Sequence, residues 1–411
     1  MKTDELAGWV AIPAPSGREA RLRGTIVREL EAFGARPETL PGGPGGPSGP
    51  GESRGLCWQI DPLGNLIVPP VHGPREGVLT LAAPLDEPGV VVTHIDEQGY
   101  LRFDLVGNLE PSEINGRLVL LQGQTGDCFG VIALDRRLRQ RGRGNAGNSG
   151  QAAGELRAEE LFIDIGAPSR AEAEREVTVG SAGVLWWAGI WSDAPGGTGE
   201  GTRGVLIRMG SGPDRLAGRA LGRRSLAYLL FDLIRSSAAP PAVSPSASPV
   251  SPATAAARPA AFVFTVQSLL GGRGIQTAAF RLEPDPLIVL MPVAAHDWPA
   301  ADPGEVKLGG GPVLVLKEGP GTSDRDLAAR LEAVAGSAGI PLQRHVATGR
   351  MANDLSQGAW AGRGARALGL GLPVRAAAGG GPEIIATADW TALRELLLRL
   401  LGEGIDHEQR R

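Results

Sequence analysis

The feature that most constrains this fold is a set of five segments that consist mostly of consecutive apolar residues, without regular polar alternation. They are LTLAAPL at 79–85, VLIRM at 205–209, AFVFTVQ at 261–267, PLIVLMPVA at 286–294 and PVLVLKE at 312–318. A strand with one face in water alternates apolar and polar residues. These uninterrupted segments therefore predict strands of a sheet that is covered on both faces.

Segments of helical periodicity lie between the predicted strands. Apolar residues recur on one helical face at 22–33, 226–234 and 393–401. Ser16 and Glu19 predict a capping box before the first of these helices, and Ser169 and Glu172 predict another further along the chain. The alternation of strands and amphipathic helices predicts an α/β domain with a doubly covered sheet.

The length of the chain, 411 residues, exceeds the size at which a single core keeps growing, so two structural units are expected. Segment 89–204 is strand-like and rich in glycine, which predicts an inserted β domain. The α/β domain then comprises 1–88 and 205–411. Stretches rich in Gly, Pro, Ser and Ala predict disordered surface loops. These loops are 41–55, 139–155 and 239–259.

Composition and charge exclude several classes of function. A net charge of -4 gives no general attraction to nucleic acid or to an anionic membrane surface. No apolar run reaches the roughly 18 residues of a membrane span, and the N-terminus lacks the pattern of a signal peptide. Cys57 and Cys128 are far apart, which excludes a disulfide framework or a thiolate metal site. The sequence therefore predicts a soluble cytoplasmic protein with no nucleic-acid or membrane partner.

A series of motifs covers nearly the whole chain. In order they are IPAPSGREARLR, DPLGNLIV, THIDEQGYLRF, LFIDIGAPSRAEAE, GRALGRRS, FVFTVQSLLGGRGIQTAAF followed by EPD, and KLGGGPV. This series resembles the successive motifs of the tetrahedral, glutamyl-type dinuclear metallo-aminopeptidases. The resemblance implies a zinc-peptidase-like α/β domain with an inserted β-barrel-like dimerisation domain, two divalent metal ions, and assembly into large particles.

The same resemblance implies that the metal ligands and the general base are replaced in this chain. The family's strand motif places a histidine ligand where Pro84 stands, although the following Asp86 is retained. The bridging aspartate corresponds to a glycine, the paired glutamates to a serine and a leucine, and a further aspartate to a methionine. The final histidine, past Arg375, corresponds to an alanine, or to Gly379 if the extra residue before Glu383 is placed earlier. Together with Pro84, the replaced positions are Gly222, Ser268, Leu269, Met291 and Ala378.

These residue types cannot hold two hard divalent cations. A dinuclear peptidase site needs imidazole and carboxylate donors, which let the metals lower the pKa of a bound water. A thioether prefers soft ions, and the other side chains either lack a donor or offer only a hydroxyl. Carboxylates clustered without a metal repel each other, so apolar replacement stabilises a site that has lost its catalytic role.

Several other residues offer alternatives. His296 and Asp297 could form a rebuilt mononuclear site with Asp86, but a solvated loop histidine is the favoured interpretation. The loop Gly271–Gly274 lies between a strand and a helix yet lacks the spacing of a phosphate cradle. Ser268 lacks the elbow motif of a nucleophile.

Two further groups concern partners. The arginines at 136, 137, 139, 141 and 143 lack the interleaved aromatics of an RNA-binding segment. Trp186, Trp187 and Trp191 suit either a subunit interface or a local core.

The sequence thus predicts a metallo-aminopeptidase homologue that is catalytically inactive and acts as a binding or assembly subunit, at least dimeric. An active paralogue or peptides are candidate partners. The alternative hypothesis is an active aminopeptidase that releases N-terminal residues through a rebuilt metal site.

Overall fold

The structure is a computed structural model that describes most of the chain. The described residues are 1–38, 55–71, 73–74, 77–138, 156–187, 205–210, 214–238, 258–299, 301–349, 352–376, 381–403 and 405. The predicted loop 139–155 lies outside the described residues, as do nearly all of the predicted loops 41–55 and 239–259.

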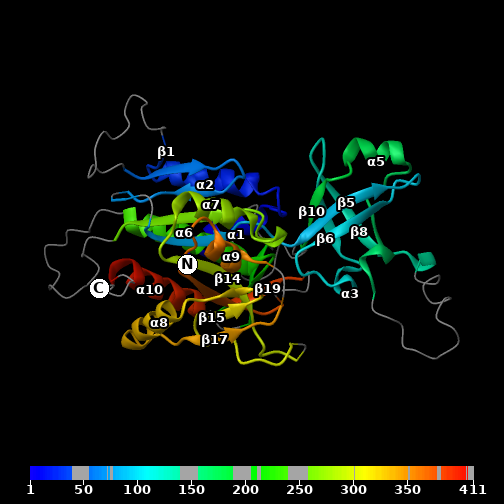
Figure 1. Ribbon diagram of the computed structural model, residues 1–411. Coiled ribbons are helices and arrows are strands. Elements are labelled where there is room, and N and C mark those ends of the chain that lie inside the picture. Colours follow the sequence, from blue (N-terminus) through cyan, green and yellow to red (C-terminus); the bar gives the residue numbers. More distant parts are fainter. Residues whose placement is uncertain are drawn as a thin grey trace.

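The larger unit is built on a 10-stranded mixed sheet (Figure 1). Its strands, in spatial order, are β1 (Arg36–Pro37), β2 (Cys57–Ile60), β3 (Leu66–Val68), β13 (Ala260–Thr265), β4 (Leu79–Pro84), β14 (Leu287–Ala294), β18 (Ala367–Val374), β15 (Val313–Glu318) and β16 (Gly321–Thr322), with β17 (Gln343–Val346) paired to β15. The four central strands, from β13 to β18, run parallel to one another.

Helices cover both faces of this sheet, as the apolar segments predict. Successive residues of β4 separate between two hydrophobic clusters: Leu81 and Ala83 face one, and Ala82 faces the other. The first cluster includes residues of α1 (Thr3–Ala11), α2 (Ala20–Ala32), α6 (Leu221–Ala238), α8 (Arg325–Ser337) and α10 (Thr387–Glu403). The second includes residues of α7 (Arg273–Leu282) and α9 (Asp354–Trp360).

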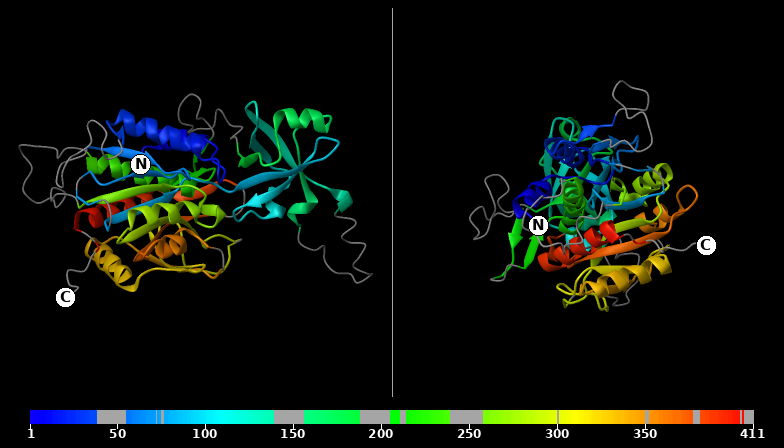
Figure 2. Two further views of the ribbon diagram at one scale, coloured as in Figure 1. Left: turned by 45° about the horizontal axis from the view of Figure 1, so that its top comes forward. Right: turned by 90° about the vertical axis from the view of Figure 1, so that its left-hand side faces the viewer.

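A closed barrel forms the second unit, to one side of the sheet domain (Figure 2). Its strands, in order around the barrel, are β10 (Ala182–Trp186), β5 (Gly89–Ile95), β6 (Leu101–Val106), β9 (Leu161–Asp164), β8 (Asp127–Leu134) and β7 (Leu118–Gln122). Its short helices are α3 (Pro111–Ile114), η1 (Ala158–Glu160) and α5 (Arg170–Glu176). The predicted fold class, a doubly covered mixed sheet with a barrel-like insertion, is confirmed.

Two local predictions are wrong in detail. The segment 205–209 forms only β11 (Leu206–Arg208), which joins β12 (Arg215–Gly218) and β19 (Glu383–Ala386) in a separate small sheet. Ser16 does not cap the first long helix, which begins at Ala20, because its hydroxyl hydrogen-bonds elsewhere. Ser169 does cap α5, accepting the backbone N–H of Glu172.

Candidate functional site

Parallel strands of the central sheet end at one edge, which is where α/β sheets place their ligand sites. β4 ends at Pro84 and continues into Asp86 and Glu87, and β13 ends at Thr265, directly opposite Pro84 in the register. A short helix, η3 (Ser268–Leu270), follows β13. These strand ends bring together the residues that the sequence analysis considers as site positions.

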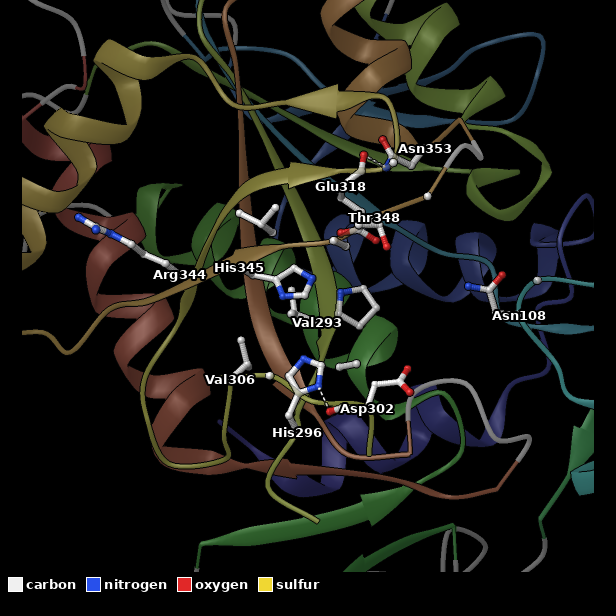
Figure 3. A pocket seen from close by; sticks show the side chains of 18 of the residues that line it. Asn108, Val293, His296, Asp302, Val306, Glu318, Arg344, His345, Thr348 and Asn353 are labelled. Carbon is white, nitrogen blue, oxygen red and sulfur yellow. Dashed lines mark hydrogen bonds between the residues drawn. The ribbon is translucent and has the colours of Figure 1, made fainter. Parts of the chain in front are cut away.

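A cavity of about 890 Å³ opens at this edge (Figure 3). The α/β domain supplies most of its wall, and the loop after β6 of the barrel supplies Gly107 and Asn108. The polar lining residues used below are Arg223, Ser268, His296, Asp302, Glu305, Glu318, Arg344, His345 and Asn353.

Asp86, the retained family carboxylate, is fully buried beneath the cavity floor and has a donor on each oxygen. Arg223 Nη1 lies 2.8 Å from Oδ1, while the Ser16 hydroxyl and the backbone N–H of Leu269 each donate to Oδ2 at 2.8 Å. A guanidinium therefore balances the charge that a metal ion would balance in a metallopeptidase.

Glu87, the next residue, is bound in the same way by arginines. It pairs with Arg219 and with Arg224 Nη2, the latter at 2.6 Å, and accepts the backbone N–H of Ala14. Burial opposes ionisation of Glu87, but the two guanidinium groups outweigh it and hold its pKa below the ordinary value. The floor of the cavity is thus an internally neutralised network of carboxylates and arginines.

Gly222 and Glu383 form a second buried contact at this floor. The backbone N–H of Gly222 donates to Glu383 Oε2 at 2.7 Å. Burial raises the pKa of Glu383 to about 7, because the hydrogen bond and the charge of Arg223 only partly compensate. A Cβ on Gly222 would lie 2.7 Å from Val374 Cγ2 and 3.0 Å from Pro292 Cβ, so the position has no room for a side chain.

Asp354, at the start of α9, lies behind Ser268. It is 5% exposed, and its Oδ2 accepts the Thr265 hydroxyl at 3.0 Å. Burial, with the charge of Asp86, raises its pKa to about 6. The Ser268 hydroxyl is close enough to favour ionisation, but no donor in the described residues reaches Oδ1 with hydrogen-bond geometry.

The replaced family positions are not all brought together. Ser268 and Leu269 line the cavity, and Pro84 and Gly222 are buried close to its floor. Met291, 8% exposed, packs in the hydrophobic cluster shared with α7 and is not among the described lining residues. Ala378 lies outside the described residues.

The side chains of the proposed rebuilt site are separately engaged. Asp297 forms a bidentate pair with Arg375, at 2.9 and 2.6 Å, which lowers its pKa. His296 lines the cavity, but its Nδ1 contacts the Asp302 carbonyl oxygen at 2.8 Å and its ring stacks on His345 at a centroid distance of 6.2 Å. Asp86 has the partners given above, so these residues do not converge on one point.

The other residues that the sequence analysis considers are the glycine loop at 271–274, the two cysteines and the arginine run. Gly272 has a positive φ of 69° at the N-cap of α7, and a Cβ there would lie 2.9 Å from the backbone of Asn353. Neither Cys57, which is buried, nor Cys128, which is half-buried, forms a disulfide in the described part of the chain. Of the arginine run, only Arg136 and Arg137 are described.

Trp186 and Trp187 of the insertion lie near the junction with the α/β domain. Trp186 packs edge-on against Phe129 and under Arg219, whose guanidinium carbon lies 5.2 Å from the indole centroid. Trp187 lines a small cavity with Glu87 and Glu383. Trp191 lies outside the described residues.

Sequence reasoning missed Arg223, Glu318 and Asp354. Arg223 has a detectable signal, since in GRALGRRS it directly follows Gly222, where the family resemblance implies a carboxylate. Glu318 ends a predicted strand and Asp354 opens a helix, and neither has a local signal that distinguishes it from a solvated acid.

These residues do not fit a pair of hard divalent cations. Such ions take several imidazole or carboxylate donors, whereas both oxygens of Asp86 are taken by protein donors and Glu87 is taken by arginines. In the part of the chain that the structure describes, no three His, Cys, Asp or Glu side chains gather in an arrangement able to hold a metal ion. Among these residues, no helix combines the length and apolar character needed to cross a membrane.

A doubly covered mixed sheet, an inserted barrel and a cavity at the parallel strand ends define an aminopeptidase-like hydrolase fold. The family model described as M42 glutamyl aminopeptidase matches residues 64–187 and 253–396. The chain therefore belongs to this metallopeptidase family, as its motifs predict.

Curated relatives of this chain are also named as aminopeptidases. The chain is 28% identical over 288 residues to a putative aminopeptidase of Acetivibrio thermocellus, covering 70% of this chain and 71% of the relative. It is 29% identical over 342 residues to the putative aminopeptidase FrvX of Escherichia coli, covering 79% of each.

Solved structures show the same fold. A TET aminopeptidase from a marine sediment archaeon of the Thaumarchaeota superimposes with a TM-score of 0.75 at 22% identity, covering 99% of this chain and 100% of that one. The TET1 peptidase of Pyrococcus horikoshii, described as able to assemble into a tetrahedron or a large octahedral shell, superimposes with a TM-score of 0.70 at 23% identity, covering 97% and 98%.

Proposed function

We propose that this chain is a catalytically silent member of the aminopeptidase family that acts as a binding and assembly subunit. The observation that carries the proposal is the pairing of Asp86 with Arg223 at 2.8 Å, in the place where the family resemblance implies a metal. A cation fixed to the chain neutralises the carboxylate but polarises no water molecule for attack on a peptide bond.

The replaced positions support the same conclusion. Pro84 and Leu269 offer no metal donor, and Leu269 uses its backbone N–H to hold Asp86. Gly222 is enclosed by Val374 and Pro292, so a ligand side chain has no space there. Ser268, at the position that the family resemblance gives to the general base, has a hydroxyl that stays protonated near neutral pH and is too weak a base to accept a proton from water.

Metal analysis of the purified protein tests the proposal. We expect no stoichiometric zinc, cobalt or manganese, and no cleavage of aminoacyl chromogenic substrates above background. A chelator should leave the melting temperature unchanged, because burial of the apolar sheet rather than an ion stabilises the domain. Uptake of about two metal ions per chain at micromolar affinity, or a turnover that a chelator abolishes, would show that a metal site is rebuilt.

Assembly is the second part of the proposal, and an apolar patch on the barrel supports it. Leu118 on β7 lies opposite Val131 on β8, and Phe129 lies two residues along on the same face. These side chains are 42%, 43% and 53% exposed. Contiguous exposed apolar groups on a folded protein mark an interaction site, and the family resemblance gives the inserted domain a dimerisation role.

Light scattering tests this part. We expect at least a dimer at micromolar concentration, rather than the 42.6 kDa of one chain. Phe129→Glu should dissociate it, whereas Phe280→Glu, at a more exposed position on α7, should not. The junction residue Trp187 is a poor test position because its side chain lines the small cavity beside Glu87. A monomeric wild-type protein would refute dimerisation.

A further inference from the structure

A separate pocket lies at the other end of the parallel strands, away from the cavity described above. Its walls come from the end of β3, the start of β13 and the last turns of two helices: α6 contributes Ile234 and Ser237, and α10 contributes Leu401. We call it the α6–α10 pocket. Its volume is about 260 Å³, and it shares no lining residue with the cavity at the strand ends.

The interior of the α6–α10 pocket is apolar. Lining residues that belong to the first hydrophobic cluster are at most 5% exposed, and they are Val68, Ile234, Phe262 and Leu401. Pro259 completes the wall and is itself closely packed, since a Cβ on Gly73 would lie 2.7 Å from Pro259 Cγ. These walls are part of the folded core, so the pocket is formed before any ligand binds. An apolar group that leaves water for this space is stabilised by the hydrophobic effect.

A positive charge without a partner lies at the mouth of the pocket. Arg258 lines the pocket and is exposed. Its backbone N–H donates to the carbonyl oxygen of Leu401 at 3.3 Å, which attaches this segment to the last turn of α10. In the described chain, the guanidinium of Arg258 has neither an ion pair nor a hydrogen bond. Asp285 lines a neighbouring pocket together with Arg258, but its carboxylate pairs with Arg366 at 2.7 Å.

These features define the class of ligand. A free guanidinium suits a carboxylate, which it can bind through two parallel N–H···O bonds. Ser237, also exposed at the mouth, offers a hydroxyl beside it. The apolar interior suits a hydrocarbon chain. Since a water molecule takes about 30 Å³ of the liquid, the volume of about 260 Å³ holds roughly nine groups of that size, which fits an aliphatic acid of medium length.

The nearby helix ends act against an anion, but weakly. α6 and α10 both end at this pocket, and a helix C-terminus carries about half an elementary negative charge, which is screened where the end is exposed. The guanidinium of Arg258 carries a full charge and can contact the ligand directly. Its charge therefore outweighs that of either helix end.

We propose that the α6–α10 pocket binds an amphipathic carboxylate, an aliphatic acid whose chain enters the apolar interior while its carboxylate pairs with Arg258. The pocket is separate from the cavity at the strand ends, so the inference does not depend on the proposed function or on the metal content of the protein.

Calorimetry with three probes tests the charge of the ligand. Octanoate, 1-octanol and octylammonium share one hydrocarbon chain and differ in their head group. We expect octanoate to bind at least about tenfold more tightly than 1-octanol, because only the carboxylate forms a charge-assisted pair with a guanidinium. Octylammonium should bind most weakly. Equal binding of octanoate and 1-octanol, or tightest binding of octylammonium, would overturn the pairing with Arg258.

Shorter acids test the apolar interior. Hexanoate and butanoate keep the carboxylate and lose methylene groups. Each methylene that is removed should weaken binding by about fourfold, since burial of one such group stabilises by about 0.8 kcal/mol. An affinity that does not depend on chain length would show that the hydrocarbon chain stays outside the pocket, and would overturn the proposal.

Variants locate the site. Arg258→Gln should remove the preference for octanoate over 1-octanol, whereas Arg330→Gln, at an exposed position on α8 outside the pocket, should leave it unchanged. Val71→Trp, at a half-buried wall position, should fill the pocket and weaken octanoate binding at least about tenfold. Unchanged octanoate affinity in Arg258→Gln or in Val71→Trp would place the ligand elsewhere and overturn the site. If a variant does not fold, the head-group and chain-length series on the wild-type protein decide.

Discussion

The carboxylates at the floor of the cavity at the strand ends are paired with arginines, whereas those at its outer wall are not. On the floor, Asp86 and Glu87 are buried and each pairs with arginine from α6 or the segment before it. The carboxylates of Glu318, Asp302 and Glu305 line the wall of the cavity, here called the outer wall, and form no ion pair in the described chain. Charges that are paired inside the protein are compatible with a stable fold, whereas a partly buried charge without a partner lowers stability.

The largest expected effect on stability comes from removing the buried ion pair between Glu87 and Arg224 at the cavity floor. Glu87→Gln leaves the buried Arg224 without a carboxylate partner, so we expect the free energy of unfolding to fall by about 3–5 kcal/mol. Urea denaturation followed by circular dichroism measures it. Glu395→Gln, which removes an exposed pair with Arg399, should change stability by less than about 1 kcal/mol. A loss below about 1 kcal/mol in Glu87→Gln would mean that the floor is not structural.

An intermediate effect should appear in the pH dependence of stability. The folded protein keeps a proton on Glu383 up to a pKa of about 7, whereas the unfolded chain releases it near 4.5. Folding takes up a proton in this window, so stability should fall as pH rises from about 4.5 to about 7, by at most about 3 kcal/mol. The lowered pKa of Glu87 acts only below this window.

Glu383→Gln isolates this contribution. Its melting temperature should decline less between pH 5 and about 7 than that of the wild-type protein. The comparison is needed because the lowered pKa of His345 acts in the opposite direction below its ordinary 6.5. Parallel pH profiles for variant and wild type would contradict the assignment.

The smallest effect, and the one that sharpens the contrast, concerns the outer wall. Glu318→Gln removes an uncompensated charge without leaving a cation unpaired, so stability should stay constant or rise by less than about 1 kcal/mol. Thermal denaturation at pH 7 measures this. A clear loss of stability would show that Glu318 has a structural partner, as Asp86 and Glu87 do.

Much of the architecture could be predicted from local patterns. Uninterrupted apolar runs such as 261–267 indicated a sheet covered on both faces, because side chains of successive strand residues enter opposite clusters. The capping prediction at Ser16 was wrong for a physical reason: its hydroxyl donates to Asp86, 70 residues away, and that contact depends on tertiary structure.

The candidate site was less predictable. The family motifs predict which positions differ from a metal site, and this stays a prediction, but they do not predict the ion pair of Arg223 with Asp86, which joins residues 137 positions apart in the chain. Glu318 forms no ion pair in the described chain because the nearby Arg223 and Arg344 pair with other carboxylates. Those carboxylates, Asp86 and Glu332, belong to distant parts of the sequence. Met291, like Pro84 and Ser268, stands at a position where the family resemblance implies a ligand or the general base. Its side chain nevertheless packs in a hydrophobic cluster and does not line the cavity.

The close packing around Gly222 makes the change in this site hard to reverse. A single substitution to aspartate would press a new Cβ against Val374 and Pro292 and set a second carboxylate beside Glu383. An aspartate at this position could be accommodated only if Val374 and Pro292 shifted or were replaced by smaller residues. If the proposed function holds, the packing around Gly222 would therefore keep a single substitution from rebuilding a metal ligand here.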